Sequence, residues 1–167
     1  MFKVNYLVGD NMLIKDTMEK FIKAQNAHDV EGVLSCFSPS FRRRSAETQW
    51  EEMGVGNYGD MSVRFWNAFP DTHFEVQHLM IDGNFVFLQY RETGTWTGTW
   101  EMPGGIVIPA QNAPYETTAI ITCEMDENAL IERYCYYCQD GFRKAYPVLN
   151  RSRVVTKNES ADKQVID

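Results

Sequence analysis

Several residue patterns are missing from this 167-residue chain, and each absence excludes a class of protein. No apolar stretch approaches the roughly 20 residues that a membrane-spanning helix needs, so we expect no membrane partner. Only three histidines occur, and none belongs to an H-E-x-x-H motif or a comparable ligand spacing. The chain also has no glycine-rich phosphate loop after a strand and no G-x-S-x-G motif. The sequence therefore indicates neither a metal site nor a cofactor.

Basic residues are outnumbered, with 16 Lys and Arg against 23 Asp and Glu, which gives a net charge of −7. An acidic chain without a long basic stripe is a poor candidate for binding nucleic acid or anionic membranes. The one basic run is Arg42-Arg43-Arg44, which we interpret either as a solvated strand or loop edge or as a local anion contact. The first residues lack the apolar segment and cleavage site of a signal peptide, and this predicts a cytoplasmic protein.

The four cysteines include a C-x-x-C pair, Cys135 and Cys138, whose spacing is known from redox and metal sites. The pair lies in a run with the character of a strand, where a separation of three residues puts the side chains on opposite faces. Their Cα atoms would then be about 10 Å apart, which is beyond the reach of a disulfide. We expect reduced thiols that serve in packing.

Hydrophobic residues make up 44% of the chain and aromatic residues 13%, which is enough for one core. Aromatic residues are left over for a cavity. Residues 1–146 predict a single domain. Residues 147–167 are polar and predict a flexible tail.

The stretch from Phe69 to Trp100 predicts two long strands joined by a tight turn. Phe74 to Met80 alternates between two faces, and Phe85 to Thr93 is rich in aromatic and β-branched residues. Asp82-Gly83-Asn84 lies between them and suits a hairpin. We expect a three-residue loop, because it brings the apolar stripes of both strands to one side of the sheet. This register leaves three polar groups on that apolar face: His78, Tyr90 and Glu92.

Apolar residues at helical spacing predict three helices, at about 10–27, 29–37 and 60–68. Strands are expected at 41–45, at 95–101, at 116–125 and at 129–138, with a loop at 103–114. Helices followed by a mainly antiparallel sheet predict an α+β fold with the helices packed on one face. Glycines at 94, 98, 104 and 105 are suited to bending the sheet.

Five motifs in order resemble the SnoaL-like polyketide cyclases of the nuclear transport factor 2-like superfamily: FIKAQNAHDVEGVLSCFSPSF, FPDTHFEVQHLMIDGNFV, GTWTG, IPAQN and DENALIERYCYYC. The match covers about Met12 to Tyr146. The resemblance implies a cone-shaped curved antiparallel sheet wrapped around three N-terminal helices, a pocket at the wide end and a homodimer formed through the sheet. Members include cyclases, isomerases, dehydratases, hydrolases and non-catalytic binding modules, so the fold does not fix the function.

The family motifs differ from this chain at the residues that carry catalysis. The family's GTHTG reads GTWTG here, which puts Trp96 at the histidine position. Its IPATG loop ends in Asn112 instead of glycine, at a position suited to the left-handed conformation. The aspartate that acts as acid and base on the last strand falls at Cys135, and a second aspartate falls at Cys138. The usual acid–base pair is therefore absent.

We therefore assign catalysis to the polar groups of the inner face. Desolvation would raise the pKa of Glu92 and suit it to general acid–base catalysis. Tyr90 would donate to a substrate oxygen, and His78 would relay protons. Each has a plainer alternative: a solvated Glu92 at the barrel mouth, a satisfied core histidine and a packing tyrosine. The expected substrate-binding residues are Trp50, Trp66, Trp96, Cys135 and Tyr137.

Two functions follow from this assignment. The first is a cofactor-free enzyme that acts on a small hydrophobic substrate, polyketide-like or isoprenoid-like, by proton transfer in a cyclisation, isomerisation or dehydration. The second is a non-catalytic module of the same fold that binds a small ligand or serves in dimerisation. The absence of the usual acid–base positions favours the second, and the inward polar groups favour the first.

Overall fold

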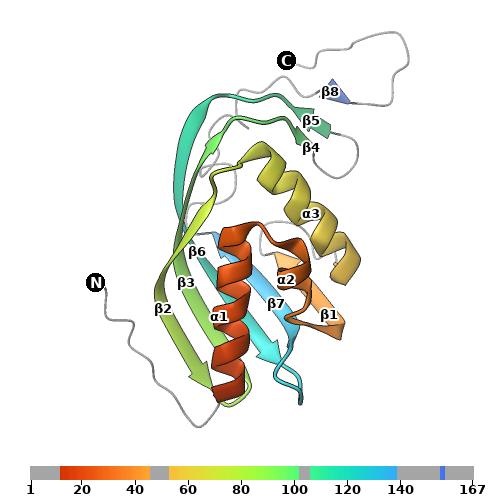
Figure 1. Ribbon diagram of the computed structural model, residues 1–167, viewed down its shortest axis with the longest axis vertical. Coiled ribbons are helices and arrows are strands. Elements are labelled where there is room, and N and C mark those ends of the chain that lie inside the picture. The colour runs from red at the N-terminus through yellow and green to blue at the C-terminus, as the bar shows by residue number, and fades with distance from the viewer. Residues whose placement is uncertain (1–11, 46–52, 102–105, 139–154, 157–167) are drawn as a thin grey trace.

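The computed structural model describes residues 12–45, 53–101, 106–138 and 155–156 (Figure 1). Its elements, in chain order, are α1 (Met12–Ala27), α2 (Val30–Leu34), β1 (Phe37–Ser45), α3 (Val55–Ala68), β2 (His73–Asp82), β3 (Phe85–Trp96), β4 (Trp100–Glu101), β5 (Ile106–Ile108), β6 (Ala113–Met125), β7 (Ile131–Cys138) and β8 (Val155–Thr156). The end of the predicted domain, at 139–146, and most of the predicted tail lie outside the described residues.

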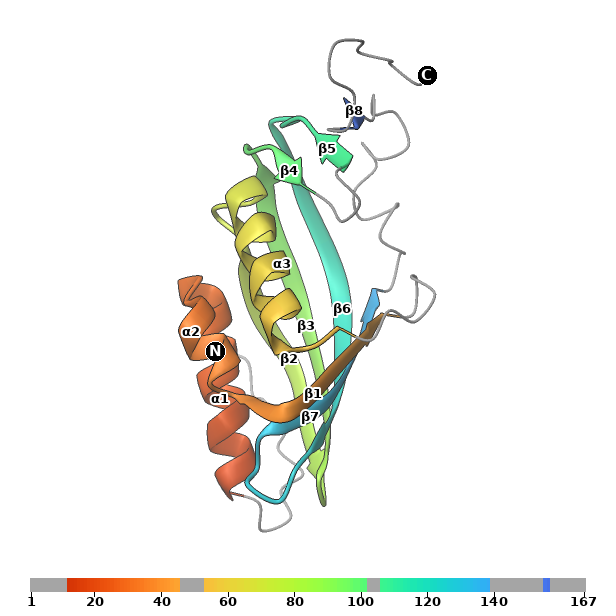
Figure 2. The ribbon, with the colours of Figure 1, turned by 90° about the vertical axis from the view of Figure 1, so that its right-hand side faces the viewer.

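Five strands form one curved sheet in the order β1-β7-β6-β3-β2. The three helices cover one face of this sheet, and the long strands β3 and β6 bend over α3 (Figures 1 and 2). The predicted α+β fold with a curved sheet around N-terminal helices is confirmed. The sheet is antiparallel except between β1 and β7, which run parallel. A second, small sheet has the order β4-β5-β8.

The hairpin between β2 and β3 differs from the predicted register near its turn. The turn has two residues, Gly83 and Asn84, and Gly83 adopts a φ of 57°. Glycine at the first central position is typical of a type II′ hairpin turn. The predicted three-residue loop is therefore wrong, and Ile81 pairs with Val86.

A bulge at Gln77 restores the predicted pairing farther from the turn. Because one residue of β2 is left over between Val76 and His78, Val76 still faces Tyr90 as expected. On the turn side of the bulge the inner face is formed by the residues at 79 and 81. His78 therefore faces outward and is exposed, which corrects its predicted place on the apolar face.

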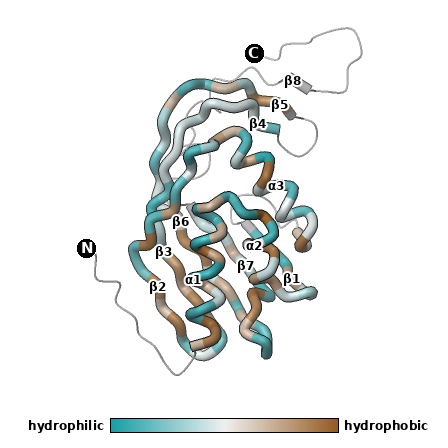
Figure 3. Tube along the Cα trace, viewed as in Figure 1, coloured by the Kyte–Doolittle hydropathy of each residue, from teal (hydrophilic) through white to brown (hydrophobic). Residues whose placement is uncertain are grey.

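The main core lies between α1 and the half of the sheet near the β2–β3 turn, where hydrophobic positions are concentrated (Figure 3). Met18 and Phe21 of α1 are fully buried there, together with Leu88, Ile121 and Ile131 of the sheet. Helical spacing in α1 and alternation in the strands direct these side chains toward each other.

A second cluster fills the other end of the molecule, between the last turn of α3 and the strands β4 and β5. It consists of Ala68, Phe69, Trp96, Trp100, Ile108 and Tyr115. Close approach of the backbone at Gly98 makes this packing feasible, because a Cβ at that position would collide with the carbonyl oxygen of Asn67. The amide of Gly98 donates a hydrogen bond to the carbonyl of Ala68 at 3.0 Å.

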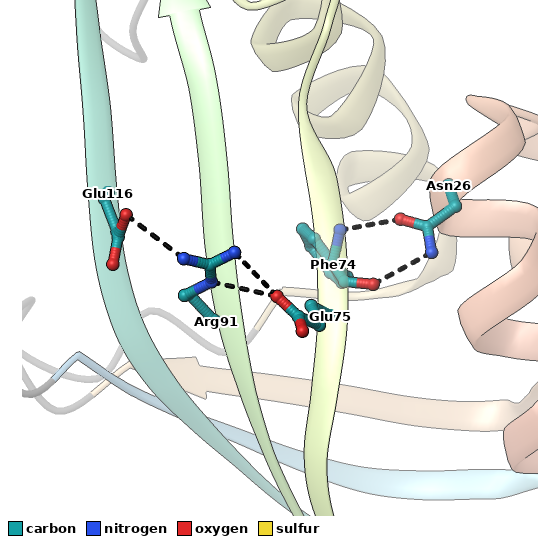
Figure 4. A network of polar contacts seen from close by, with 5 residues as sticks. All are labelled: Asn26, Phe74, Glu75, Arg91 and Glu116. Carbon is teal, nitrogen blue, oxygen red and sulfur yellow. Dashed lines mark hydrogen bonds and ion pairs between the residues drawn. The ribbon is translucent and has the colours of Figure 1, made fainter. Parts of the chain in front are cut away.

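Polar side chains fix the strands that separate these two clusters (Figure 4). The side-chain amide of Asn26, at the end of α1, donates to the carbonyl of Phe74 at 3.0 Å and accepts from its N–H at 2.7 Å. On the opposite face, Arg91 bridges Glu75 at 2.8 Å and Glu116 at 3.4 Å, across three strands. Together they hold α1, β2, β3 and β6 in register at the level of the polar groups described next.

Candidate functional site

The inner face of β3 changes from aliphatic to polar along its length. Val86 and Leu88 are followed on the same face by Tyr90 and Glu92, because side chains alternate along a strand. The Glu92 side chain is nevertheless buried, with 3% of its residue surface exposed, and Tyr90 is 1% exposed. The prediction that both groups lie on the inner face is confirmed, and the alternative of a solvated Glu92 is wrong.

The Glu92 carboxylate is the end point of a buried chain of hydroxyl groups. The Tyr115 hydroxyl donates to Glu92 Oε1 at 2.9 Å. Thr72 Oγ1 lies 2.9 Å from the same tyrosine oxygen. Because the tyrosine proton goes to the carboxylate, the threonine hydroxyl is the donor to Tyr115. The chain therefore runs from Thr72 through Tyr115 to Glu92 and fixes the orientation of the carboxyl group.

Gly94 makes room for this chain. It pairs with Tyr115 across β3 and β6. A Cβ at position 94 would lie 2.7 Å from Tyr115 Cε1 and 3.0 Å from Thr72 Oγ1. A side chain there would push the tyrosine ring away from Glu92, so glycine is required by space at this position.

Tyr90 presents a hydroxyl that forms no hydrogen bond within the described ranges. Its ring stacks on Phe74 with centroids 4.4 Å apart. Burial raises the pKa of Tyr90 well above its usual value, and the nearby charge of Glu92 raises it further. Tyr90 is therefore a neutral hydrogen-bond donor at physiological pH.

His28, just after the end of α1, supports Thr72, where the series of hydrogen-bonded hydroxyl groups begins. His28 Nε2 lies 3.1 Å from the carbonyl oxygen of Thr72, and the imidazole ring stacks on Trp66 with centroids 5.1 Å apart. His28 reaches this position through a left-handed backbone conformation, with a φ of 53°. This contact fixes the backbone of Thr72 and hence the position of its hydroxyl.

The predicted substrate-binding residues are divided among different places. Trp66 is buried on the inner side against His28, whereas Trp96 belongs to the second cluster, where its indole N–H donates to the carbonyl of Gly98 at 2.8 Å. Asn112 has a φ of 52°, which confirms the expected left-handed position in the IPAQN loop. Trp50 lies outside the described residues.

Cys135 and Tyr137 were expected on the pocket wall, and this placement is wrong. Both lie on the outer face of β7, paired in register with Thr122 and Ile120 of β6. Tyr137 is 40% exposed. Neighbouring residues of a strand lie on opposite faces, so the residues next to Cys135 in β7 point inward, and Tyr134 is one of them.

The sequence patterns did not indicate Thr72 and Tyr115 as site residues. The predicted loop ended at Pro114 and the predicted strand began at Glu116, so the tyrosine between them was assigned to neither. A signal was present, because an aromatic residue next to Pro114 opens a run that alternates through to Met125. Thr117, buried directly opposite Glu92, belonged to that alternation.

The described residues contain no group of three or more His, Cys, Asp or Glu side chains that could hold a metal ion. No helix in the described ranges is long and apolar enough to cross a membrane. An open depression of about 490 Å³ lies over the same strands, lined by Asp71, Thr93, Gly94, Thr95, Pro114, Tyr115 and Glu116. Chemically, the inner site offers one carboxyl group and neutral hydroxyl donors, a set suited to proton transfer.

Comparisons with solved structures give the fold a context. The chain is similar to AclR, a candidate hydroxylase from Streptomyces galilaeus, with 18% identity, a TM-score of 0.67 and coverage of 82% of this chain and 80% of that one. It is also similar to IdmH, a candidate polyketide cyclase from Streptomyces antibioticus, with 17% identity, a TM-score of 0.65 and coverage of 82% and 98%. A candidate polyketide cyclase from Acidithiobacillus ferrooxidans matches with 18% identity, a TM-score of 0.64 and coverage of 87% and 99%.

A comparison with curated proteins finds no match. The family model described as the SnoaL-like domain matches residues 18–134, which include the second part of α1, all of α2 and α3, and the strands β2, β3 and β6. The curved sheet, the helices on its inner face and this match over most of the chain agree. The chain belongs to the SnoaL-like domain family.

Proposed function

We propose that the protein is a cofactor-free enzyme that acts on a small hydrophobic substrate by proton transfer, with Glu92 as the general acid and base. The observation that carries the proposal is the buried Glu92 carboxyl group held by the Tyr115 hydroxyl at 2.9 Å. Burying a carboxyl group costs free energy unless it is well hydrogen-bonded, and such groups are concentrated at functional sites. The names of similar structures, among them candidate polyketide cyclases, favour the same class of chemistry.

In this mechanism Glu92 takes a proton from a carbon next to a substrate carbonyl. The carbonyl oxygen then gains negative charge, and the Tyr90 hydroxyl donates a hydrogen bond to it. Return of the proton to another carbon gives an isomerisation. Attack of the enolate carbon on a second carbonyl gives a cyclisation, and Glu92 returns its proton to the new alkoxide. Tyr115 keeps the carboxyl group oriented throughout.

Deuterium exchange tests the acid–base role without knowledge of the natural substrate. The protein is incubated with 2-tetralone in D₂O, and exchange at the carbons beside the carbonyl is followed by NMR. Glu92→Gln should lower the protein-dependent rate at least about 100-fold, the usual scale of a general base. Glu116→Gln is the matched control, since its side chain is 60% exposed on the neighbouring strand.

The same experiment separates the enzyme from a binding module. A wild-type protein that binds 2-tetralone without accelerating exchange would favour the second function, a non-catalytic ligand-binding module. Glu92→Gln with an unchanged rate would remove the catalytic assignment. His78 is left out of the mechanism because it is exposed on the outer face.

We also propose that the protein forms a homodimer through the outer face of the sheet. Met80, Phe85 and Tyr137 come from three strands of this sheet and are 40%, 44% and 40% exposed. A second copy that packs on this face would bury them. Light scattering should give a dimer for the wild type and a monomer for Phe85→Glu. Met12→Glu, at an exposed position on α1, is the matched control, and a monomeric wild type would contradict the proposal.

A cytoplasmic location stays a prediction of the sequence. Fractionation of cells that express the protein tests it, with the expectation that the protein is recovered with the cytoplasmic enzymes.

A further inference from the structure

The three arginines of β1 do not share one environment. Arg42 and Arg44 are exposed, whereas Arg43 is partly buried on the face that carries Phe41. Alternation along the strand accounts for this difference. Arg43 pairs in register with Tyr134 of β7, and its backbone exchanges two hydrogen bonds with Met53 at 2.9 and 3.2 Å. The middle arginine is therefore held in place while its neighbours extend into solvent.

Three tyrosine rings surround the guanidinium group of Arg43. Its central carbon lies 5.9 Å from the ring centroid of Tyr58, 6.0 Å from that of Tyr134 and 5.8 Å from that of Tyr136. Burial raises the pKa of Tyr58, and the charge of Arg43 acts in the opposite direction. The arginine is thus the positive group of an aromatic enclosure, a setting that favours a cation.

One donor in this enclosure is unsatisfied. Arg43 Nε is buried and has no hydrogen-bond partner. Within the described part of the chain, no carboxylate forms an ion pair with Arg43. Buried donors almost always have an acceptor, and leaving one without a partner costs free energy. Arg43 is therefore a cation with one buried donor, and the described part of the chain supplies no acceptor for that donor.

We propose that Arg43 is an anion-binding site that takes the carboxylate of a small aromatic acid. The planar guanidinium matches a carboxylate, which can accept from Nε–H and a neighbouring N–H side by side. The tyrosine rings provide a surface for the flat body of the ligand. A carboxylate fits better than a phosphate, because a single guanidinium group matches one negative charge on a planar group more closely than the larger charge of a phosphate.

The site shares a hydrophobic cluster with the residues assigned to proton transfer. Tyr58 and Tyr134, which lie against Arg43, belong to the same cluster as Tyr90, and the charge of Glu92 acts on Tyr90. If the proposed function holds, the substrate carries a carboxylate at one end and the reacting carbonyl at the other. Binding at Arg43 is itself independent of turnover.

Two probes that differ only in charge test the site. The affinities of 2-naphthoate and 2-naphthamide are measured by isothermal titration calorimetry. The wild type should bind the acid at least tenfold more tightly than the amide, and Arg43→Met should abolish that preference. Arg42→Met removes the same charge from an exposed position of the same strand, and this variant should keep the preference for the acid. Equal affinities in the wild type, an unchanged preference in Arg43→Met, or an equal loss in Arg42→Met would overturn the proposal.

Thermal unfolding without ligand excludes a purely structural role. Arg43→Met should have an unchanged or higher Tm, because it removes a donor that has no partner. A variant that unfolds or loses many degrees would overturn the proposal. Arg43→Lys is the second variant, since it keeps the charge and loses Nε. It should bind 2-naphthoate at least threefold more weakly at an unchanged Tm, and unchanged affinity would count against the fork geometry.

Glu92→Gln separates this proposal from the proton-transfer mechanism. The variant should bind 2-naphthoate like the wild type, because Arg43 makes the contact. Failure of 2-naphthoate to bind leaves the exchange experiment with 2-tetralone unaffected, and failure of that exchange leaves the binding result unaffected.

Discussion

The two halves of the inner face of β3 are equally buried and chemically different. Val86 and Leu88 are packed among aliphatic and aromatic side chains of the main core. Tyr90 and Glu92 continue the same face. The Tyr90 ring still packs on Phe74, whereas the Glu92 carboxyl group meets the hydroxyl of Tyr115 instead of hydrocarbon. Burial therefore does not separate a core from a site in this molecule. The core and the site are instead distinguished by whether the buried side chains are polar, because burying a polar group costs free energy and packing hydrocarbon does not.

The first prediction compares the stability of the two halves. Leu88→Ala should lower the free energy of unfolding by about 2–5 kcal/mol, since it leaves a cavity in the main core. Glu92→Gln should change it by less than about 1 kcal/mol, because the amide keeps the shape and an oxygen that accepts from Tyr115. Urea unfolding measures both. A larger loss in Glu92→Gln would make Glu92 a structural residue and remove the contrast.

The second prediction concerns the space that the polar half needs. Gly94→Ala should cost about 1–3 kcal/mol, because its Cβ forces Tyr115 off Glu92. Gly56→Ala in α3 is the control, since no atom lies within 4 Å of a Cβ there, and it should raise stability by about 0.5–1 kcal/mol. Equal effects of the two substitutions in urea unfolding would show that Tyr115 adjusts freely.

The third prediction uses the raised pKa of Tyr90. The folded protein keeps a proton that the unfolded chain releases above pH 10, so this contribution to stability is complete below pH 10 and declines above it. The decline is about 1.4 kcal/mol per pH unit for each such tyrosine. Tyr90→Phe should therefore lose stability less steeply than the wild type between pH 10 and 11. Identical slopes in urea unfolding would contradict this.

The fourth prediction concerns the polar contacts between the halves. Asn26→Ala should cost about 1–2 kcal/mol, because it removes two hydrogen bonds to Phe74. It should also speed amide hydrogen exchange at Phe74. Arg91→Met should have less effect than Asn26→Ala, since its ion pairs are exposed and screened by salt. A larger loss in Arg91→Met would reverse this order.

The sequence predicted the α+β architecture and the inward side chains of β3, because both depend on local periodicity. It did not predict the register of the hairpin near its turn. The bulge at Gln77 allows one register near the turn, where Ile81 pairs with Val86, and another beyond it, where Val76 pairs with Tyr90. Strict alternation along β2 would permit only one of the two. Nothing local distinguishes a bulged residue from an ordinary one, so His78 was assigned to the wrong face.

The site depends on contacts that cross the sheet, and these are harder to infer. Tyr115 reaches Glu92 only because a glycine lies beside it on the neighbouring strand, and pairing of the strands had to be known first. Cys135 was placed inward by its resemblance to a family motif, but Tyr134 holds the inward position of β7, and neighbouring residues of a strand lie on opposite faces. The environment of Arg43 likewise follows from a parallel strand pair that the order of elements did not indicate.

The contact between Asn26 and Phe74 also bears on how the sheet meets other chains. β2 is a border strand of the five-stranded sheet, and such strands recruit further polypeptides through unpaired backbone groups. At Phe74 the side-chain amide of Asn26 imitates the missing neighbour, accepting from the N–H and donating to the carbonyl. Lateral growth of the sheet is blocked at this point, so association is directed to the broad face of the sheet and away from its rim.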